Sequence, residues 1–300
     1  GSKRLVSMSI QSLISDAGGI VMIDEIEQGL EPDRVKNLTR NLERKRQGQI
    51  FITSHSQNVI EELDASNLYI VKNVDGICTL TNCNEEFQSL VRACPEAIYA
   101  NKVIVCEGKT ELGICRAIDE YRIHQGLSSF SENGVVYTLG EGNNFTSRAE
   151  RLFKLNKKVC VFCDSDVDDE LSPTKDELKA FDIPIFDCDE GLAIEQQLFN
   201  DMSWEGIQDI VKYLLEDMSL DSISQSVNSK YDGKLANDWL NNDEANKRVA
   251  LGLASKKNAW FKRIDHGEVI GNVFYNNIKA LTETKQFSII DGISKWVDNE

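Results

Sequence analysis

Two apolar runs in the middle of the chain each stop at an acidic residue. Residues 102–106 read KVIVC and precede Glu107, and residues 158–163 read KVCVFC and precede Asp164. Continuous apolar runs of this length, between stretches with helical periodicity, are typical of strands buried on both faces of a parallel sheet. Neighbouring parallel strands deliver their C-terminal ends to one edge of that sheet. The sequence therefore predicts an α/β fold with carboxylates gathered at this edge.

The same alternation of strand and helix patterns extends over most of the chain. In the first part we expect strands at 19–24 and 49–56, helices at 32–46 and 56–66, and a hairpin over 67–83. In the second part we expect a helix at 110–125, a strand at 134–140, a helix at 145–155, strands at 158–166 and 183–189, and a mainly helical region at about 195–250. This order predicts a first α/β unit at residues 1–83, a linker at 84–98 and a second unit at 99–300.

Composition limits the class of protein. The 300 residues include 49 acidic and 33 basic side chains, for a net charge of −16. This balance argues against a sequence-independent nucleic-acid coat, but it leaves room for a local basic channel. No stretch approaches the roughly 20 apolar residues that span a bilayer, and no signal peptide is visible. Cys160 and Cys163 should point to opposite faces of a strand, so we expect reduced thiols and a cytoplasmic protein.

The first unit carries acidic and histidine residues at strand ends. Asp24 and Glu25 follow the run IVMI, and His55 follows IFITS. An acid at a strand end can hold Mg²⁺, and a second acid can orient a hydrolytic water. These residues and the turn EQGLEP resemble the Walker B, His-switch and D-loop motifs of ABC-type ATPases, and residues 1–10 resemble the end of their signature motif. The resemblance implies that residues 1–83 are the C-terminal part of an ABC-type ATPase domain.

The phosphate-binding loop of such ATPases is missing from this sequence. No complete G-x-x-x-x-G-K-[ST] pattern occurs, and the GKT at residues 108–110 lacks the first glycine of that loop. We therefore expect the part of the domain that cradles ATP to lie upstream of residue 1.

The second unit combines acids from separate segments into a candidate metal site. Glu111 lies one helical turn after Glu107 if a helix begins near Gly108. Asp164 and Asp166 share a side if their strand continues, and Asp168 extends the series. Clustered carboxylates repel one another, and a divalent cation removes that penalty. Hard oxygen ligands favour Mg²⁺ or Mn²⁺, with Ca²⁺ as a further possibility.

A glutamate after the first strand of a unit and a D-x-D after its third strand resemble the Toprim domain. The matching residues here are Glu107, Asp164 and Asp166, and the loop LGEGNNF at 139–145 stands where that family has a glycine-bearing loop. The resemblance is clearest over residues 96–200. It implies that residues 99–300 form a Toprim nuclease domain, with a Rossmann-like parallel sheet and a helical insertion or appendage.

An ABC-type ATPase followed directly by a Toprim domain is similar to the OLD-family (overcoming lysogenization defect) endonucleases, which include the nuclease subunit of the Gabija anti-phage system. In that family, acids of an E-x-x-x-E and a D-x-x-x-D pattern hold two metal ions. The resemblance implies the following metal ligands: Glu107, Glu111, Asp164, Asp168 and, between the last two, Asp166.

The family resemblance implies further site residues. Glu195, in AIEQQLF, matches an acid that also approaches the metals. The family uses a lysine from the far end of the domain, and SKKNAWFKR is the matching segment. Lys257 is the first choice for that role, followed by Lys256 and Lys262, because the spacing does not decide between them. Glu107 is also a candidate general acid or base.

The segment SKKNAWFKR also forms a basic and aromatic cluster. Lys256, Lys257, Lys262 and Arg263 are suited to contact a DNA backbone, and Trp260 could stack on a base. The alternative is an amphipathic segment whose aromatic side chains lie in the core. We expect both, with the aromatic rings inside and the basic groups outside.

These observations predict a metal-dependent DNA endonuclease that is regulated by an ATPase domain and acts in anti-phage defence. The expected cofactors are Mg²⁺ or Mn²⁺ in a two-metal site, and ATP in the full-length protein. The expected partners are DNA, a second copy of the chain through the ATPase domain, and a helicase if the system is Gabija-like, with no membrane. Two alternatives remain, namely topoisomerase- or primase-like Toprim chemistry, and a non-catalytic ABC-type regulatory scaffold with a structural cation.

Overall fold

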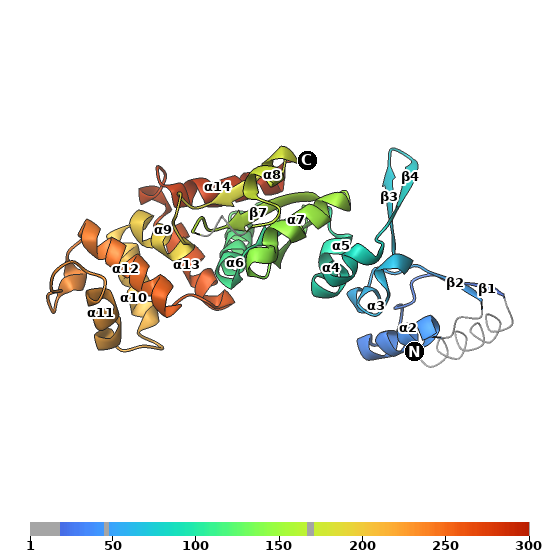
Figure 1. The fold of residues 1–300 in the computed structure, drawn as a ribbon, viewed down its shortest axis with the longest axis horizontal. Helices are drawn as coiled ribbons and strands as arrows, with labels where there is room; N and C mark the ends of the chain where they lie inside the picture. Colours follow the sequence, from blue (N-terminus) through green and yellow to red (C-terminus); the bar gives the residue numbers. More distant parts are fainter. Residues whose placement is uncertain (1–18, 45–47, 167–170, 300) are drawn as a thin grey trace. The chain divides into compact units, whose positions relative to one another are not determined.

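A computed structural model describes residues 19–44, 48–166 and 171–299 (Figure 1). The chain divides into two compact units, residues 1–99 and 100–300. Each unit contains parallel strands and helices, so the predicted α/β class is confirmed. No helix in the described ranges is both long enough and apolar enough to cross a membrane.

The first unit is built on a short parallel pair of strands, β1 (Ile20–Ile23) and β2 (Gln49–Ile52). Its helix α2 (Pro32–Arg44) begins at a proline, whose missing N–H costs nothing in the first turn. The core of this part consists of small aliphatic side chains from strand, helix and loop: Val21, Ile23, Ile26, Val35, Leu42 and Val59. The segment expected to be a long helix after β2 contains a single α-helical turn, α3 (Gln57–Ile60), and the start of a short 3-10 helix at Ala65.

The rest of the first unit is a hairpin and a set of short helices. The predicted hairpin is present as antiparallel β3 (Tyr69–Val74) and β4 (Ile77–Asn82). Residues 84–98, expected to be a linker, are largely helical and contribute the buried Phe87, Leu90 and Val91. Their helical elements are η2 (Glu85–Phe87), α4 (Gln88–Ala93) and α5 (Pro95–Tyr99), and η1 (Ala65–Asn67) precedes the hairpin.

The second unit has a four-stranded, fully parallel sheet in the order β6-β5-β7-β8. The strands are β5 (Lys102–Cys106), β6 (Val135–Leu139), β7 (Lys158–Cys163) and β8 (Ile185–Asp187). The helices between them are α6 (Lys109–His124), α7 (Phe145–Lys154) and α8 (Lys175–Ala180), with η3 (Gly142–Asn144) before α7. Because β6 lies on one side of β5 and β7 on the other, the direction of winding reverses at the β5/β7 pair, where ligands bind in such sheets.

Both faces of this sheet are covered. Ile104 and Phe162 pack with Ile114 of α6 in the main core cluster, while Val103 and Val161 are also fully buried. Burial of successive residues explains why these strands are apolar without alternation. The remaining helices follow β8 (Figure 1): α9 (Ile194–Asp201), α10 (Trp204–Leu214), α11 (Leu220–Asn228), η4 (Trp239–Asn241), α12 (Ala245–Asn258), α13 (Ile264–Asn276), η5 (Ile278–Ala280) and α14 (Lys285–Asp298).

Glycines allow α6 and α13 to approach closely. A Cβ on Gly113 would lie 2.0 Å from the carbonyl oxygen of Ile264, and a Cβ on Gly267 would lie 2.2 Å from that of Thr110. Next to this contact, the Thr110 hydroxyl donates to the carbonyl oxygen of Phe261. The start of α6 is therefore tied to the segment between α12 and α13.

Substitution of Gly113 by alanine tests this close approach. We expect Gly113→Ala to lower the free energy of unfolding by about 2 kcal/mol, because the clash with backbone atoms outweighs the better helix propensity of alanine. Glu120→Ala, at an exposed position of α6, should leave stability nearly unchanged. Urea denaturation of the three proteins measures the difference, and equal midpoints would contradict the packing described here.

Candidate functional site

The ends of β5 and β7 bring the first pair of acids together. Cys106 is in register with Phe162, and the ladder continues one residue further, because the backbone N–H of Glu107 donates to the Phe162 carbonyl oxygen at 2.9 Å. The side chain of Glu107 then accepts a hydrogen bond from the backbone N–H of Asp164 at 3.1 Å. The predicted convergence of Glu107 and Asp164 at the C-terminal edge of the sheet is present.

Asp166 approaches this pair for a reason that differs from the predicted one. The strand ends at Cys163 and the chain bends over Ser165 and Asp166, so the alternation of a strand does not place Asp164 and Asp166 on one side. The two carboxyl groups nevertheless interact, which raises the pKa of Asp164 and helps to lower that of Asp166. The ammonium of Lys256, in the last turn of α12, lies 2.5 Å from Asp166 Oδ2.

Two further carboxylates lie in the interior of the site. Glu111 is 4% exposed in the first turn of α6, where its Oε2 accepts a hydrogen bond from the backbone N–H of Gly108 at 3.0 Å. The helix begins at Lys109, as the glycine after Glu107 predicted. Glu195, at the start of α9, is 1% exposed, and Lys262 Nζ lies 3.1 Å from its Oε1.

Burial and mutual repulsion shift the pKa values of these acids. Burial, followed by the charge of Glu107, raises the pKa of Asp164 to about 9. Burial also raises the pKa of Glu111 to about 7, with Glu107 and Glu195 adding to the effect. Burial likewise raises the pKa of Glu107. Burial alone would raise the pKa of Asp166, but the hydrogen bond and charge of Lys256, together with the interaction with Asp164 and a backbone hydrogen bond, outweigh burial and lower the pKa.

The type and burial of these side chains suit a hard divalent cation, but the side chains do not form a complete set of metal ligands. Neither carboxylate oxygen of Glu195 has a well-directed hydrogen bond from a described residue, although Lys262 is close. Within the described ranges, no three His, Cys, Asp or Glu side chains are close enough together to hold a metal ion as they stand. Mg²⁺ commonly binds through only one or two carboxylates, with water and substrate phosphate as its other ligands. Asp168 lies outside the described residues.

The candidate basic residues separate into different environments. Lys256 and Lys262 point to acids of the cluster, whereas Lys257 is exposed and pairs with no acid among the described residues. Arg263 pairs with Asp265, and its Nη1 lies 3.5 Å from Asp217 Oδ2. As expected, the neighbouring aromatic rings are inside: Trp260 is 5% and Phe261 1% exposed.

Two residues at this edge were missed from the sequence, although Asp187 follows the apolar run IPIF and so has the same strand-end signal as Glu107 and Asp164. Asp187 ends β8, the third of three adjacent strands that finish at an acid, and lies between Lys175 Nζ at 3.7 Å and Lys285 Nζ at 3.8 Å. Lys175 is a buried lysine at the start of α8 that also donates to the carbonyl oxygen of Asp164 at 2.7 Å. Lys175 belongs to no recognisable motif, because only the folded chain places it beside the cluster.

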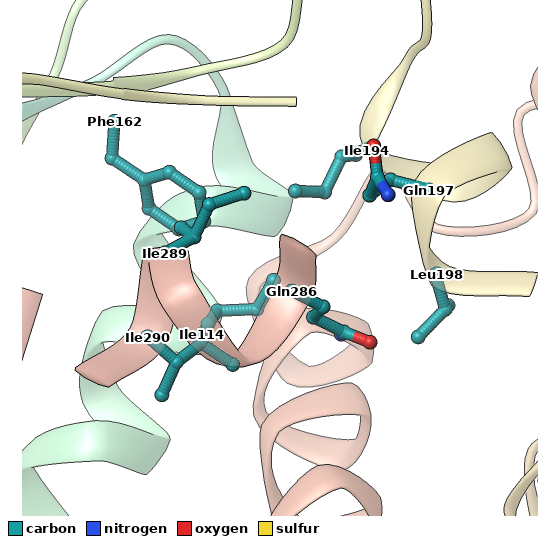
Figure 2. Close-up of a pocket in the computed structure, with 8 residues that line it drawn as sticks. All are labelled: Ile114, Phe162, Ile194, Gln197, Leu198, Gln286, Ile289 and Ile290. Atoms are coloured by element: carbon teal, nitrogen blue, oxygen red, sulfur yellow. The ribbon is translucent and has the colours of Figure 1, made fainter. Parts of the chain in front are cut away.

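A small cavity lies in the core of the second unit. Figure 2 shows the side chains around it, and the amides of Gln197 and Gln286 are the polar groups among them. The other lining residues are Ile114, Phe162, Ile194, Leu198, Ile289 and Ile290. This apolar lining offers no group for catalysis, so the cavity does not extend the carboxylate cluster.

The candidate ATPase residues of the first unit also converge. The Thr53 hydroxyl donates to Asp24 Oδ1, and Thr53 Oγ1 accepts the backbone N–H of Glu25 at 2.9 Å. Glu27, which sequence reasoning missed, accepts the backbone N–H of His55 at 2.7 Å. Parallel pairing of β1 and β2 thus places the Asp24-Glu25 turn against the loop that carries His55. Residues 1–10, compared above with a signature motif, lie outside the described residues.

Residues 1–61 match the family model described as "AAA domain, putative AbiEii toxin, Type IV TA system". Among solved structures, the chain is similar to the C-terminal region of the OLD protein of Xanthomonas campestris pv. campestris, at 15% identity and a TM-score of 0.40. The match covers 68% of this chain and 96% of that chain, and likeness at this level carries no argument about fold or chemistry. No curated protein gives a significant match.

The raised pKa of Asp164 leads to a prediction about stability without metal. An aspartate that binds its proton more tightly in the folded protein than in the unfolded one loses stability as pH rises from about 4 to about 9. In EDTA at pH 8 we therefore expect Asp164→Asn to raise the free energy of unfolding by about 1–3 kcal/mol. Near pH 4 the gain should nearly disappear, because Asp164 is then protonated in the folded protein and about half protonated in the unfolded one.

Asp243→Asn is a control in which the pKa shift, and therefore the expected change in stability, has the opposite sign. The Arg248 hydrogen bond lowers the pKa of Asp243 despite partial burial, so this substitution should lower stability at pH 8. Thermal unfolding of the three proteins at the two pH values measures both effects. A loss of stability in Asp164→Asn at pH 8 would contradict the electrostatic description of the cluster.

Proposed function

We propose that this chain is the C-terminal part of a metal-dependent DNA endonuclease regulated by an ATPase domain. The observation that carries the proposal is the convergence of Glu107, Glu111 and Asp164 at the β5/β7 switch point, with strongly raised pKa values at two of them. Acids with perturbed pKa values at the carboxyl edge of a parallel sheet are typical of a functional site.

In the proposed mechanism, Glu107, Glu111 and Asp164 would hold Mg²⁺ or Mn²⁺, with Asp168 and Asp166 as further ligands. The bound ions would supply the attacking hydroxide and stabilise the leaving oxygen of the phosphodiester. Glu107, which lies at the C-terminal edge of the sheet, is also the candidate general acid or base.

The chain's own lysines would neutralise the charge that grows on the scissile phosphate. Lys262 and Lys256 are the candidates that the fold brings to the acids, at 3.1 Å from Glu195 and 2.5 Å from Asp166. We assign the role near the reacting phosphate to Lys262, because Thr110 ties its segment to the start of α6. Lys257, the first choice from the sequence, is exposed and suited to a contact with the DNA backbone.

The ATPase part of the proposal is supported by the first unit. The Asp24-Glu25 turn and the His55 loop are adjacent, and the model that matches residues 1–61 is described as an AAA domain. We propose ATP as a ligand of the full-length protein, assembly through the ATPase domain, a role in phage defence, and a helicase partner in a Gabija-like system.

Plasmid cleavage tests the proposed function directly. We expect the protein with Mg²⁺ or Mn²⁺ to nick or linearise supercoiled plasmid, and EDTA to stop it. Glu107→Gln should lower the rate by about 100-fold or more, because the variant loses a negative ligand at the reacting centre. Lys262→Met should lower the rate at saturating DNA, whereas Lys257→Met should mainly weaken DNA binding and reduce its salt dependence by about one counterion.

The products separate this function from its alternatives. A topoisomerase would yield relaxed, covalently closed plasmid, and a regulatory scaffold would bind the metal without changing the DNA. Cleavage that persists in EDTA or in Glu107→Gln would contradict the proposed site.

A further inference from the structure

Lys175 is an unusual residue in the second unit, because its ammonium is buried next to the carboxylate cluster. Its side chain is 7% exposed, and Nζ donates to the backbone carbonyl oxygen of Asp164 at 2.7 Å. The same nitrogen lies 3.4 Å from Ser165 Oγ and 3.7 Å from Asp187 Oδ2. Lysine is almost never buried to this extent unless its charge is paired.

The contacts of Lys175 join the ends of two strands. Asp164 and Ser165 follow β7, and Asp187 closes β8. Ser165 extends the network, since its hydroxyl donates to the carbonyl oxygen of Cys188 at 3.0 Å and its backbone N–H to that of Leu192 at 2.9 Å. The bend that carries Asp164 is therefore held from the side of β8 by a network with Lys175 at its centre.

The partner of Lys175 identifies what the residue does. Among the described residues, the shortest contact of Nζ is to the main-chain oxygen of Asp164 rather than to a carboxylate, and a contact of this kind holds the backbone in place. A fixed carbonyl oxygen holds the peptide plane between Asp164 and Ser165, which is one of the two planes that set the direction in which the Asp164 side chain leaves the backbone. On the other side of the same residue, its N–H is held by Glu107.

We propose that Lys175 is a positioning residue for the metal ligands, one that orients Asp164 by anchoring its backbone. This inference rests on the proposed function, because it concerns the same carboxylate cluster. Groups that orient metal ligands without touching the metal typically change metal affinity by 10- to 100-fold when they are removed.

The sign of the change in affinity distinguishes positioning from simple charge. A nearby ammonium repels a divalent cation, so removal of the charge alone would tighten metal binding. Loss of positioning has the opposite effect, because Asp164 then adopts orientations that do not bind. The two explanations predict changes in opposite directions for one substitution.

The experiment is a titration of the protein with Mn²⁺, followed by electron paramagnetic resonance of the free ion. We expect Lys175→Met to raise the Kd for Mn²⁺ by at least about 10-fold and Lys175→Arg to stay within a few-fold of the wild type. In plasmid cleavage, Lys175→Met should lower kcat without raising KM for DNA. Lys179→Met is the matched control, because this exposed lysine of α8 pairs only with Asp176 among the described residues and should change neither value.

Each outcome decides the proposal. Unchanged or tighter Mn²⁺ binding by folded Lys175→Met overturns it, provided that Glu107→Gln weakens binding. If the Glu107→Gln variant binds Mn²⁺ as tightly as the wild type does, the proposed metal site is wrong, and the inference about Lys175 is then wrong as well. Circular dichroism establishes that the variants fold. If Lys175→Met does not fold, Ser165→Ala removes a neighbouring hydroxyl of the network and should still weaken Mn²⁺ binding, and unchanged binding there overturns the proposal.

Discussion

The parallel pairing of β5 with β7 is the constraint on which the candidate site depends. Backbone hydrogen bonds hold the two strands in a register that sends Glu107 and Asp164 out of the sheet side by side. The repulsion between these carboxylates opposes folding, and the burial of the strands that carry them offsets it, since Ile104 and Cys160 are completely buried. The hydrophobic core thus keeps together charges that would otherwise separate.

The sequence was sufficient to predict this arrangement because its signals are local. An apolar run, an acid and a glycine at residues 102–108 specify a strand, a strand end and a helix start, and α6 does begin directly after Gly108. The second apolar run supplies β7, and the preference of strands in α/β folds for parallel neighbours supplies the pairing. The β3–β4 hairpin was also predictable, because its two strands and the turn between them are adjacent in the sequence.

The parts that could not be predicted depend on contacts between distant segments. The approach of Lys262 to Glu195 requires α12 to lie against α9, where a Cβ on Gly252 would stand 2.9 Å from the Cα of Gln196. Nothing in SKKNAWFKR distinguishes Lys262 from Lys257, because the difference arises from this packing. Lys175 has no motif, and its relation to Asp164 becomes visible only when the bend after β7 is folded.

The pairing of acids with lysines divides the cluster into two groups. Asp166 and Glu195 each have a lysine partner, and the pKa of Asp166 is lowered accordingly. Glu107, Glu111 and Asp164 form no ion pair with a described side chain, and the pKa of each is raised. Burial and repulsion disfavour the ionised form of these carboxyl groups, and a bound cation offsets both effects. Among the candidate ligands, these three acids therefore gain the most from a bound divalent ion.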